Sequence, residues 1–272
     1  MRTKRIAIVE ISGGLGNQLF QLGAAKYLSS HFDDVYIDYS PNSINDKRRT
    51  EIRDLVHQMG MKEYSYSVFI SKLLSKLRIW KFSHILRGEK LVSEIVEFEI
   101  PRIVKAQQKL RYRGYWQNKT VAMEIKDEVL AWLNPIRSEA VAVHLRRGDY
   151  AEQDNRNHHG LLSIDYFNRA ISQIQVGSKI NLYSDSPIPA DWFGELSKRF
   201  YLEDLSNLGT KETLRSIVGC NQIIISNSTF SWWGGFLSNA ELVISPSVWS
   251  PRKETPNSLI FQNMQLVSNE FN

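Results

Sequence analysis

The sequence predicts an α/β protein built on parallel sheets, because short apolar segments alternate with segments of helical periodicity. This alternation occurs in two series, one near the N-terminus and one from about residue 136 onward. Several of the apolar segments end in polar or glycine-rich residues, and ligands of doubly wound sheets bind at the carboxyl ends of the strands. We therefore expect two α/β halves, residues 1–134 and 135–272, which meet at Asn134-Pro135.

The first series opens with a strand over residues 5–11, a turn over 12–16 and a helix, and continues with a second strand over 35–39. Residues from about 41 to 110 are rich in Lys, Arg and helix formers, and we expect helices and loops there. The helix after the turn has a broad apolar face formed by Leu19, Phe20, Leu22, Ala24, Tyr27 and Leu28.

The second series contains four expected strands and three expected helices. The strands cover residues 140–146, 179–183, 222–225 and 242–244, and the helices lie near 163–175, 210–219 and 229–238. A polar loop is expected over 150–160.

The composition limits the possible functions. The 272 residues are 42% hydrophobic, which is enough for a substantial core. The net charge of +5 suits an anionic ligand but does not choose among nucleotides, nucleic acids and lipid headgroups. The single cysteine, Cys220, excludes an intrachain disulfide and a thiolate metal cluster. Since no signal peptide or membrane span is evident, we expect a cytoplasmic protein.

The segment His144–Asp149 places two adjacent arginines, Arg146 and Arg147, at the end of an apolar strand. Neighbouring guanidinium groups repel one another, and an anion between them would relieve the repulsion; arginine grips phosphate in a planar, bidentate manner. The alternative is that both arginines form surface ion pairs with Asp149 or a nearby glutamate. The segment alone leaves both interpretations open.

The glycine turn Gly13–Gly16 lets the backbone approach a ligand and offers helix N–H groups to an anion. Leu19 occupies the position of the third glycine of a dinucleotide fingerprint, although Asp38 lies near the place of the ribose-binding acid. The Gly-Lys-Ser/Thr ending of a P-loop is missing as well. The alternative is a simple strand-to-helix turn.

Two further polar clusters follow expected strands. The run Ser226–Ser231 holds more hydroxyl and amide groups than one helix cap needs, which suits a phosphate cradle, although Ser228 or Thr229 also suits a cap. Trp232 and Trp233 are expected to pack in the core. Asp185 either accepts hydrogen bonds from a base or ribose, or caps a turn.

The loop over 150–160 carries carboxylates and the pair His158-His159, any of which could act as a general base. The histidine spacing does not suit a helical metal site, and no Asp-x-Asp motif is present to hold a divalent ion. We therefore expect no metal. If a diphosphate leaves here, Arg146 and Arg147 must stabilise its charge.

Four motifs together resemble those of the bacterial α-1,2-fucosyltransferases of glycosyltransferase family 11, in order and spacing across residues 8–246. The resemblance implies a GT-B fold, with two Rossmann-like halves facing across a cleft, an acceptor side in 1–134 and a GDP-fucose side in 135–272. It implies inverting, metal-independent transfer of L-fucose from GDP-β-L-fucose to the 2-hydroxyl of a terminal galactose, without a cofactor. The motifs are Gly13–Gln21, Gly114–Gln117, His144–Tyr150 and Ser226–Gly234.

The resemblance also implies roles for individual residues. Arg147 would act in catalysis with a base chosen among Asp149, Glu152 and Asp154, while an oxocarbenium-like path could manage without a base. Ser186 departs from the family, since some relatives carry a second acid there that contacts guanine. The acceptor-binding residues would be Asn17, Gln18 and Trp116. The donor-binding residues would be Gly14, Gly16, Asn17, His144, Arg146, Arg147, Asp185, Ser226, Asn227, Ser228, Thr229 and Phe230.

The expected setting is the assembly of O-antigen or capsule repeats in a bacterial cytoplasm. The acceptor would be a galactose-terminated oligosaccharide or a lipid-linked glycan. The basic stretch Lys72–Arg113 would either contact the inner membrane or form a solvated helical face. No nucleic-acid partner is expected. The alternatives are another sugar-nucleotide glycosyltransferase with a different linkage or acceptor and, more remotely, an NAD-type oxidoreductase or a non-catalytic anion-binding module.

Overall fold

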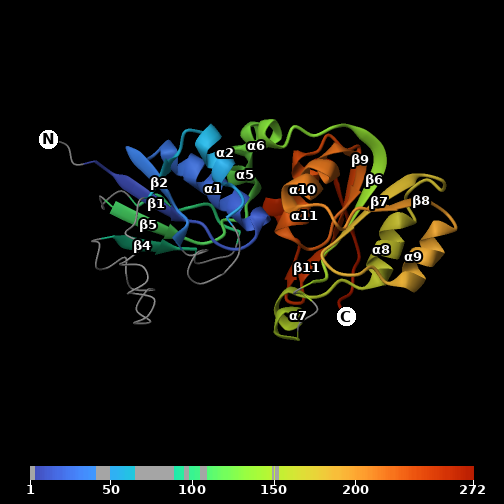
Figure 1. Ribbon diagram of the computed structural model, residues 1–272. Coiled ribbons are helices and arrows are strands. Elements are labelled where there is room, and N and C mark those ends of the chain that lie inside the picture. Colours follow the sequence, from blue (N-terminus) through green and yellow to red (C-terminus); the bar gives the residue numbers. More distant parts are fainter. Residues whose placement is uncertain are drawn as a thin grey trace. The chain divides into compact units, whose positions relative to one another are not determined.

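The computed structural model describes residues 4–40, 50–64, 89–94, 98–104, 109–148, 150 and 153–272 (Figure 1). The chain divides into two compact units, unit 1 (Met1–Trp132) and unit 2 (Leu133–Asn272). Each unit contains its own mostly parallel sheet, so the protein belongs to the α/β class.

Unit 1 is built on a five-stranded parallel sheet with the order β3-β2-β1-β5-β4. The two strands expected from the sequence, β1 and β2, are confirmed. The strands β3 and β4 lie in the region of about 41–110 where helices and loops were expected, so that expectation was wrong for them, and β5, which begins at the end of this region, was not predicted. The strand bounds are β1 (Ile6–Glu10), β2 (Asp34–Asp38), β3 (Lys62–Glu63), β4 (Lys90–Ser93) and β5 (Lys109–Arg113).

The strand β5 was not predicted because its sequence, Lys-Leu-Arg-Tyr-Arg, is rich in charged residues. Its central residue, Arg111, is only 1% exposed, so a charged residue occupies a core position where an apolar residue is normally expected. A search for hydrophobic periodicity therefore does not predict such a strand.

The main helix of unit 1, α1 (Leu15–Ser29), packs on β1 and β2 and is joined by α2 (Arg53–Gln58), α5 (Lys119–Met123) and α6 (Lys126–Leu133). Gly23 allows α1 to approach α5 closely, since a Cβ there would collide with the backbone carbonyl of Val121. Asn118 caps α5, because its side chain accepts a hydrogen bond from the Thr120 N–H at 2.9 Å.

Unit 2 is built on a six-stranded parallel sheet with the order β13-β10-β9-β6-β7-β8. All four strands expected from the second series are present. The edge strands β8 and β13 were not anticipated, because their largely exposed sequences lack an apolar run. The strand bounds are β6 (Ser138–Leu145), β7 (Lys179–Ser184), β8 (Tyr201–Asp204), β9 (Cys220–Ile224), β10 (Leu242–Pro246) and β13 (Met264–Val267).

Helices cover both faces of this second sheet, as a doubly wound topology requires (Figure 1). On one face Val141, Val143 and Leu145 of β6 pack with residues of two helices, α8 (Ile164–Ile171) and α9 (Ala190–Ser197). On the other face Ala140 and Ala142 pack with residues that include Ile217. The helices on that face are α10 (Thr210–Gly219) and α11 (Thr229–Leu237).

The expected polar loop over 150–160 contains a short helix, α7 (Gln153–His159). It lacks an apolar stripe, which is why periodicity did not predict it. A small antiparallel pair, β11 (Val248–Ser250) with β12 (Lys253–Glu254), and a 3-10 turn, η4 (Asn257–Leu259), complete unit 2.

In the described part of the chain, none of the helices combines the length and the apolar character that crossing a membrane requires. Of the basic stretch Lys72–Arg113, residues 72–88, 95–97 and 105–108 lie outside the described residues, so its predicted membrane contact stays a prediction.

Candidate functional site

Three of the predicted polar clusters meet at the carboxyl edge of the unit 2 sheet. The strand β6 lies between β7 and β9, so the loops that follow these three strands are neighbours. The loop after β6 holds Arg146 and Arg147, the loop after β7 holds Asp185, and the loop after β9 leads into α11. Parallel strand order therefore assembles one polar site from distant parts of the sequence.

Asp185 fixes the backbone of the arginine-bearing loop. Its Oδ1 accepts hydrogen bonds from the N–H groups of Arg147 at 2.7 Å and Gly148 at 2.8 Å, and its Oδ2 pairs with the Arg146 guanidinium. A Cβ at Gly148 would lie 2.6 Å from Asp185 Oδ2, so this close approach requires glycine. Asp185 thus caps a turn and forms an ion pair with Arg146, whose guanidinium also lies 5.1 Å from the Tyr150 ring centroid.

Arg147 presents its charge differently from Arg146. Its Nη1 is buried and has no hydrogen-bond partner among the described residues. A buried donor without an acceptor costs about 1–3 kcal/mol, and an anion bound at this position would supply the acceptor. Of the two arginines, Arg147 is therefore the better candidate for binding an anion.

His144 joins β6 to the loop before α11. Its Nδ1 lies 2.5 Å from the Ser231 hydroxyl and 3.4 Å from the Ser226 hydroxyl, and its ring centroid lies 5.3 Å from that of Phe230. Burial lowers the pKa of His144 to about 4, so the imidazole is neutral near pH 7. Its predicted donor contact stays a prediction.

This buried histidine predicts an acid-dependent loss of stability. The folded chain protonates His144 only near pH 4, whereas the unfolded chain does so near 6.5, so the free energy of unfolding decreases as the pH falls through this interval. We expect a contribution of about 3 kcal/mol at most. Urea unfolding from pH 7 to pH 4 should show a shallower pH dependence for His144→Gln than for the wild type. His158→Gln, which alters an exposed histidine, should keep the wild-type slope, and an unchanged slope in His144→Gln would contradict a neutral His144.

The helix α11 begins at this site without a side-chain cap. Ser228 holds the N-cap position with extended backbone angles, but its hydroxyl forms no capping hydrogen bond. The cap interpretation of this serine is therefore wrong as a hydrogen-bonding role, and the N–H groups of the first turn remain suited to an anion. The expected core packing of Trp232 and Trp233 is confirmed, since both are 0% exposed.

Asn227, in the loop between β9 and α11, has a structural role. Its Nδ2 lies within hydrogen-bond distance of three backbone carbonyls, at 2.8 Å from His159, 3.2 Å from Gly160 and 3.1 Å from Trp249. This amide nitrogen thus joins the end of α7 to β11, and the predicted donor contact of Asn227 stays a prediction. The Oδ1 of Asn227 is buried and has no partner in the described part of the chain.

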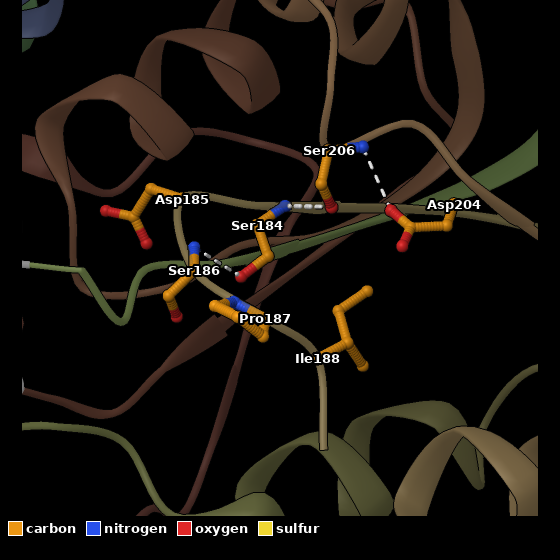
Figure 2. Close-up of a pocket in the computed structure, with 7 residues that line it drawn as sticks. All are labelled: Ser184, Asp185, Ser186, Pro187, Ile188, Asp204 and Ser206. Carbon is orange, nitrogen blue, oxygen red and sulfur yellow. Dashed lines mark hydrogen bonds between the residues drawn. The ribbon is translucent and has the colours of Figure 1, made fainter. Parts of the chain in front are cut away.

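A cavity of about 300 Å³ opens at the ends of β7 and β8 (Figure 2). Ser206 organises it, because its hydroxyl accepts the Ser184 N–H at 3.0 Å and its own N–H donates to Asp204 Oδ1 at 2.9 Å. Figure 2 shows the carboxylates of Asp185 and Asp204 on opposite sides of the residues that line the cavity. Asp204 and Ser206 were not predicted as site residues because β8 was not predicted as a strand, although its polar end was the available signal. The cavity is lined by Ser184, Asp185, Ser186, Pro187, Ile188, Asp204 and Ser206.

The candidate bases are placed only in part. Asp149 and Glu152 lie outside the described residues, and Asp154 belongs to α7 by its backbone while its side chain is outside them. Within the described ranges, no three His, Cys, Asp or Glu side chains form a group able to hold a metal ion.

The predicted residues of unit 1 surround the glycine turn. Gly13 has a left-handed φ of +77°. Gly14 is the N-cap of α1, and Gly16 lies in the first turn of that helix. Gln18 is 0% exposed and engaged at both ends of its amide, since Nε2 donates to the Gly13 carbonyl at 2.8 Å and Oε1 accepts the Glu51 N–H at 2.9 Å. Trp116 is 1% exposed. Gln18 supports the glycine turn from the interior of the unit, and the predicted acceptor contacts of Gln18 and Trp116 stay predictions.

Asp38 is not available to a ribose. It is 1% exposed, its Oδ2 pairs with Arg111 at 2.5 Å, and its Oδ1 accepts the Ser40 N–H at 2.9 Å. Together with Leu19 at the third glycine position, this pairing removes the observation that favoured an NAD-type oxidoreductase.

Comparison with known proteins identifies a family. The model of glycosyl transferase family 11 matches residues 100–254, more than half of the chain. Two Escherichia coli proteins are similar over most of their length: the O-antigen biosynthesis glycosyltransferase WbnK, at 26% identity over 88% of this chain and 93% of that protein, and an alpha-1,2-colitosyltransferase, at 24% identity over 92% and 94%.

Among solved structures, a mutant of Arabidopsis thaliana FUT1 in complex with GDP matches 93% of this chain and 72% of that chain, at 10% identity and a TM-score of 0.49. The family match spans the arginine-bearing loop and the loop before α11, where the unit 2 site is built. This chain belongs to glycosyl transferase family 11 and is a glycosyltransferase.

Proposed function

We propose that this chain transfers L-fucose from GDP-β-L-fucose to the 2-hydroxyl of a terminal galactose, with inversion and without a metal. One observation carries the donor half of this proposal: the Arg147 guanidinium has a buried Nη1 with no partner among the described residues, on a turn whose backbone Asp185 binds. The loop next to it, after β9, leads to the uncapped N-terminus of α11. A diphosphate matches both features, since it accepts hydrogen bonds and carries negative charge.

The cavity at the ends of β7 and β8 suits the guanine base. Guanine presents an N–H and an amino group side by side, and a carboxylate such as that of Asp204 accepts from both. Uracil presents one N–H between two carbonyl groups, which a carboxylate repels. Ser186 lacks the acid that some family members place there, and Asp204 supplies an acid from the next strand.

The chemistry follows from these positions. The galactose 2-hydroxyl oxygen attacks C1 of fucose from the face opposite GDP, the bond between C1 and the β-phosphate oxygen breaks, and GDP leaves with the electron pair. Arg147 and the first-turn N–H groups of α11 stabilise the negative charge on the leaving phosphate. The hydroxyl proton passes to a carboxylate among Asp149, Glu152 and Asp154, or to water if an oxocarbenium-like path precedes bond formation.

The relatives suggest the setting and a second donor. Their names contain O-antigen biosynthesis and an α-1,2 linkage, and colitose is a fucose-like sugar. We propose assembly of O-antigen or capsule repeats in the cytoplasm, on a galactose-terminated or lipid-linked glycan at the inner membrane. GDP-colitose is the second candidate donor, because the colitosyltransferase matches 92% of this chain.

The test measures GDP release by the purified chain from GDP-fucose and from GDP-colitose, with and without lactose, in excess EDTA. We expect lactose-dependent release from GDP-fucose and an α-1,2-linked product. Preference for GDP-colitose would select the second donor. Loss of activity in EDTA with rescue by manganese would overturn the metal-independent mechanism, and the absence of both GDP release and a thermal shift with GDP would overturn the donor site.

A further inference from the structure

Tyr115 is an exposed aromatic side chain at the carboxyl edge of the unit 1 sheet. It is 43% exposed and follows the end of β5, the neighbour of β1. A Cβ at Gly13 would lie 3.5 Å from the Tyr115 ring, so the ring edge lies over the glycine turn. The one other tyrosine with such exposure among the described residues, Tyr201, lies on the edge strand β8.

Glu94 holds the backbone that presents this ring. Its Oε2 accepts the Tyr115 N–H at 2.7 Å and its Oε1 accepts the Trp116 N–H at 3.2 Å. Trp116 has φ of +55°, a left-handed conformation that is strained for a bulky residue. A Cβ at Gly114 would lie 2.6 Å from the Glu94 Cβ. The turn is therefore held by Glu94 and by burial of the Trp116 side chain, and it directs Trp116 inward while Tyr115 stays exposed.

Two amide side chains border the same turn. Gln117 Nε2 donates to Asn17 Oδ1 at 3.1 Å, and Asn17 Nδ2 lies 2.9 Å from the position of a Cβ on Gly13. Asn17 Nδ2 and Gln117 Oε1 form no hydrogen bond within the described residues, which leaves one donor and one acceptor beside the ring. An aromatic face with a few convergent polar groups is the usual composition of a small-ligand site.

We propose that Tyr115 is the platform for the acceptor sugar, on which the C–H face of a galactopyranoside packs while Asn17 and Gln117 bind its hydroxyl groups. Galactose suits such a platform because the hydrogens on C3, C4 and C5 lie on one side of the ring and form an apolar patch. Glu94 is a positioning residue, since it acts through the backbone of Tyr115. This assignment rests on the proposed function and extends it to residues that contact the acceptor.

The experiment compares Tyr115→Ala, Tyr115→Phe and the wild type by steady-state kinetics and by saturation-transfer NMR with methyl β-galactoside. We expect Tyr115→Ala to raise the KM for lactose at least tenfold and to abolish the saturation-transfer signal. The KM for GDP-fucose and the thermal shift with GDP should not change. Tyr115→Phe should stay within threefold of the wild type, and Tyr201→Ala is the matched control for loss of an exposed tyrosine.

Glu94 provides an independent test of the same platform. Glu94→Ala should raise the KM for lactose without changing the KM for GDP-fucose, and Glu94→Gln should recover part of the loss because one amide oxygen still accepts an N–H. If Tyr115→Ala does not fold, Tyr115→Leu keeps an apolar side chain without the ring and takes its place. A wild-type KM for lactose in the folded variant would overturn the inference.

NMR separates this inference from the proposed function. If the wild type transfers no sugar but binds the galactoside through Tyr115, the platform stands and the proposed reaction falls. If the wild type transfers fucose and Tyr115→Ala binds the galactoside normally, the reaction stands and the platform falls.

Discussion

Replacement of Arg147 by alanine is expected to lower the turnover of sugar transfer at least about a hundredfold, as the loss of one preorganised charge stabiliser usually does. Arg147 combines a buried Nη1, which has no partner in the described part of the chain, with a backbone held by Asp185, so the loop that carries it is in place before the substrate binds. The measurement is kcat with saturating GDP-fucose and lactose.

Two further variants define this effect. Arg147→Lys keeps the charge but loses the planar fork, and we expect an intermediate turnover. Arg199→Ala removes an exposed arginine at the end of α9 and should keep wild-type turnover. Near-normal turnover of a folded Arg147→Ala variant would remove Arg147 from the active site.

Replacement of Arg111 by methionine is expected to destabilise unit 1 by about 3–5 kcal/mol, because it leaves buried carboxylates without a counter-charge. Arg111 is 1% exposed and pairs with Glu10 at 3.2 Å, Asp38 at 2.5 Å and Glu89 at 2.5 Å. Burial opposes the charge on Arg111, but Asp38 and Glu89 outweigh it and hold the pKa above its usual value. The guanidinium thus stays charged inside the unit.

Arg113 offers the matched control for this substitution. It pairs with the same Glu10 at 2.6 Å, but its side chain is 36% exposed, so Arg113→Met is expected to cost about 1 kcal/mol or less. Thermal unfolding followed by calorimetry measures both variants. Equal unfolding temperatures for Arg111→Met and Arg113→Met would show that Arg111 is not needed to compensate the negative charge of the three carboxylates.

The sequence by itself determined the α/β class and most of the central strands. Apolar runs such as residues 140–143 encode burial locally, so they predict strands without knowledge of the neighbours. Polar residues at the ends of these strands also located the Arg147 and Ser226–Ser231 clusters, since parallel strands bring their carboxyl ends to one edge. The other strands were predicted because apolar residues fill their core positions. The strand β5 was missed because the charged Arg111 occupies its core position.

Only the tertiary structure decided which partner each polar group took. Asp185 pairs with Arg146 because β7 lies beside β6, His144 is neutral because α11 and its loop bury it, and the Gln18 and Trp116 side chains point inward while Tyr115 stays exposed. The physical reason is that hydrogen bonds and ion pairs depend on distances of a few ångströms between residues far apart in the chain. The order and register of the strands set those distances, whereas the hydrophobic periodicity of the sequence predicts only which residues become buried.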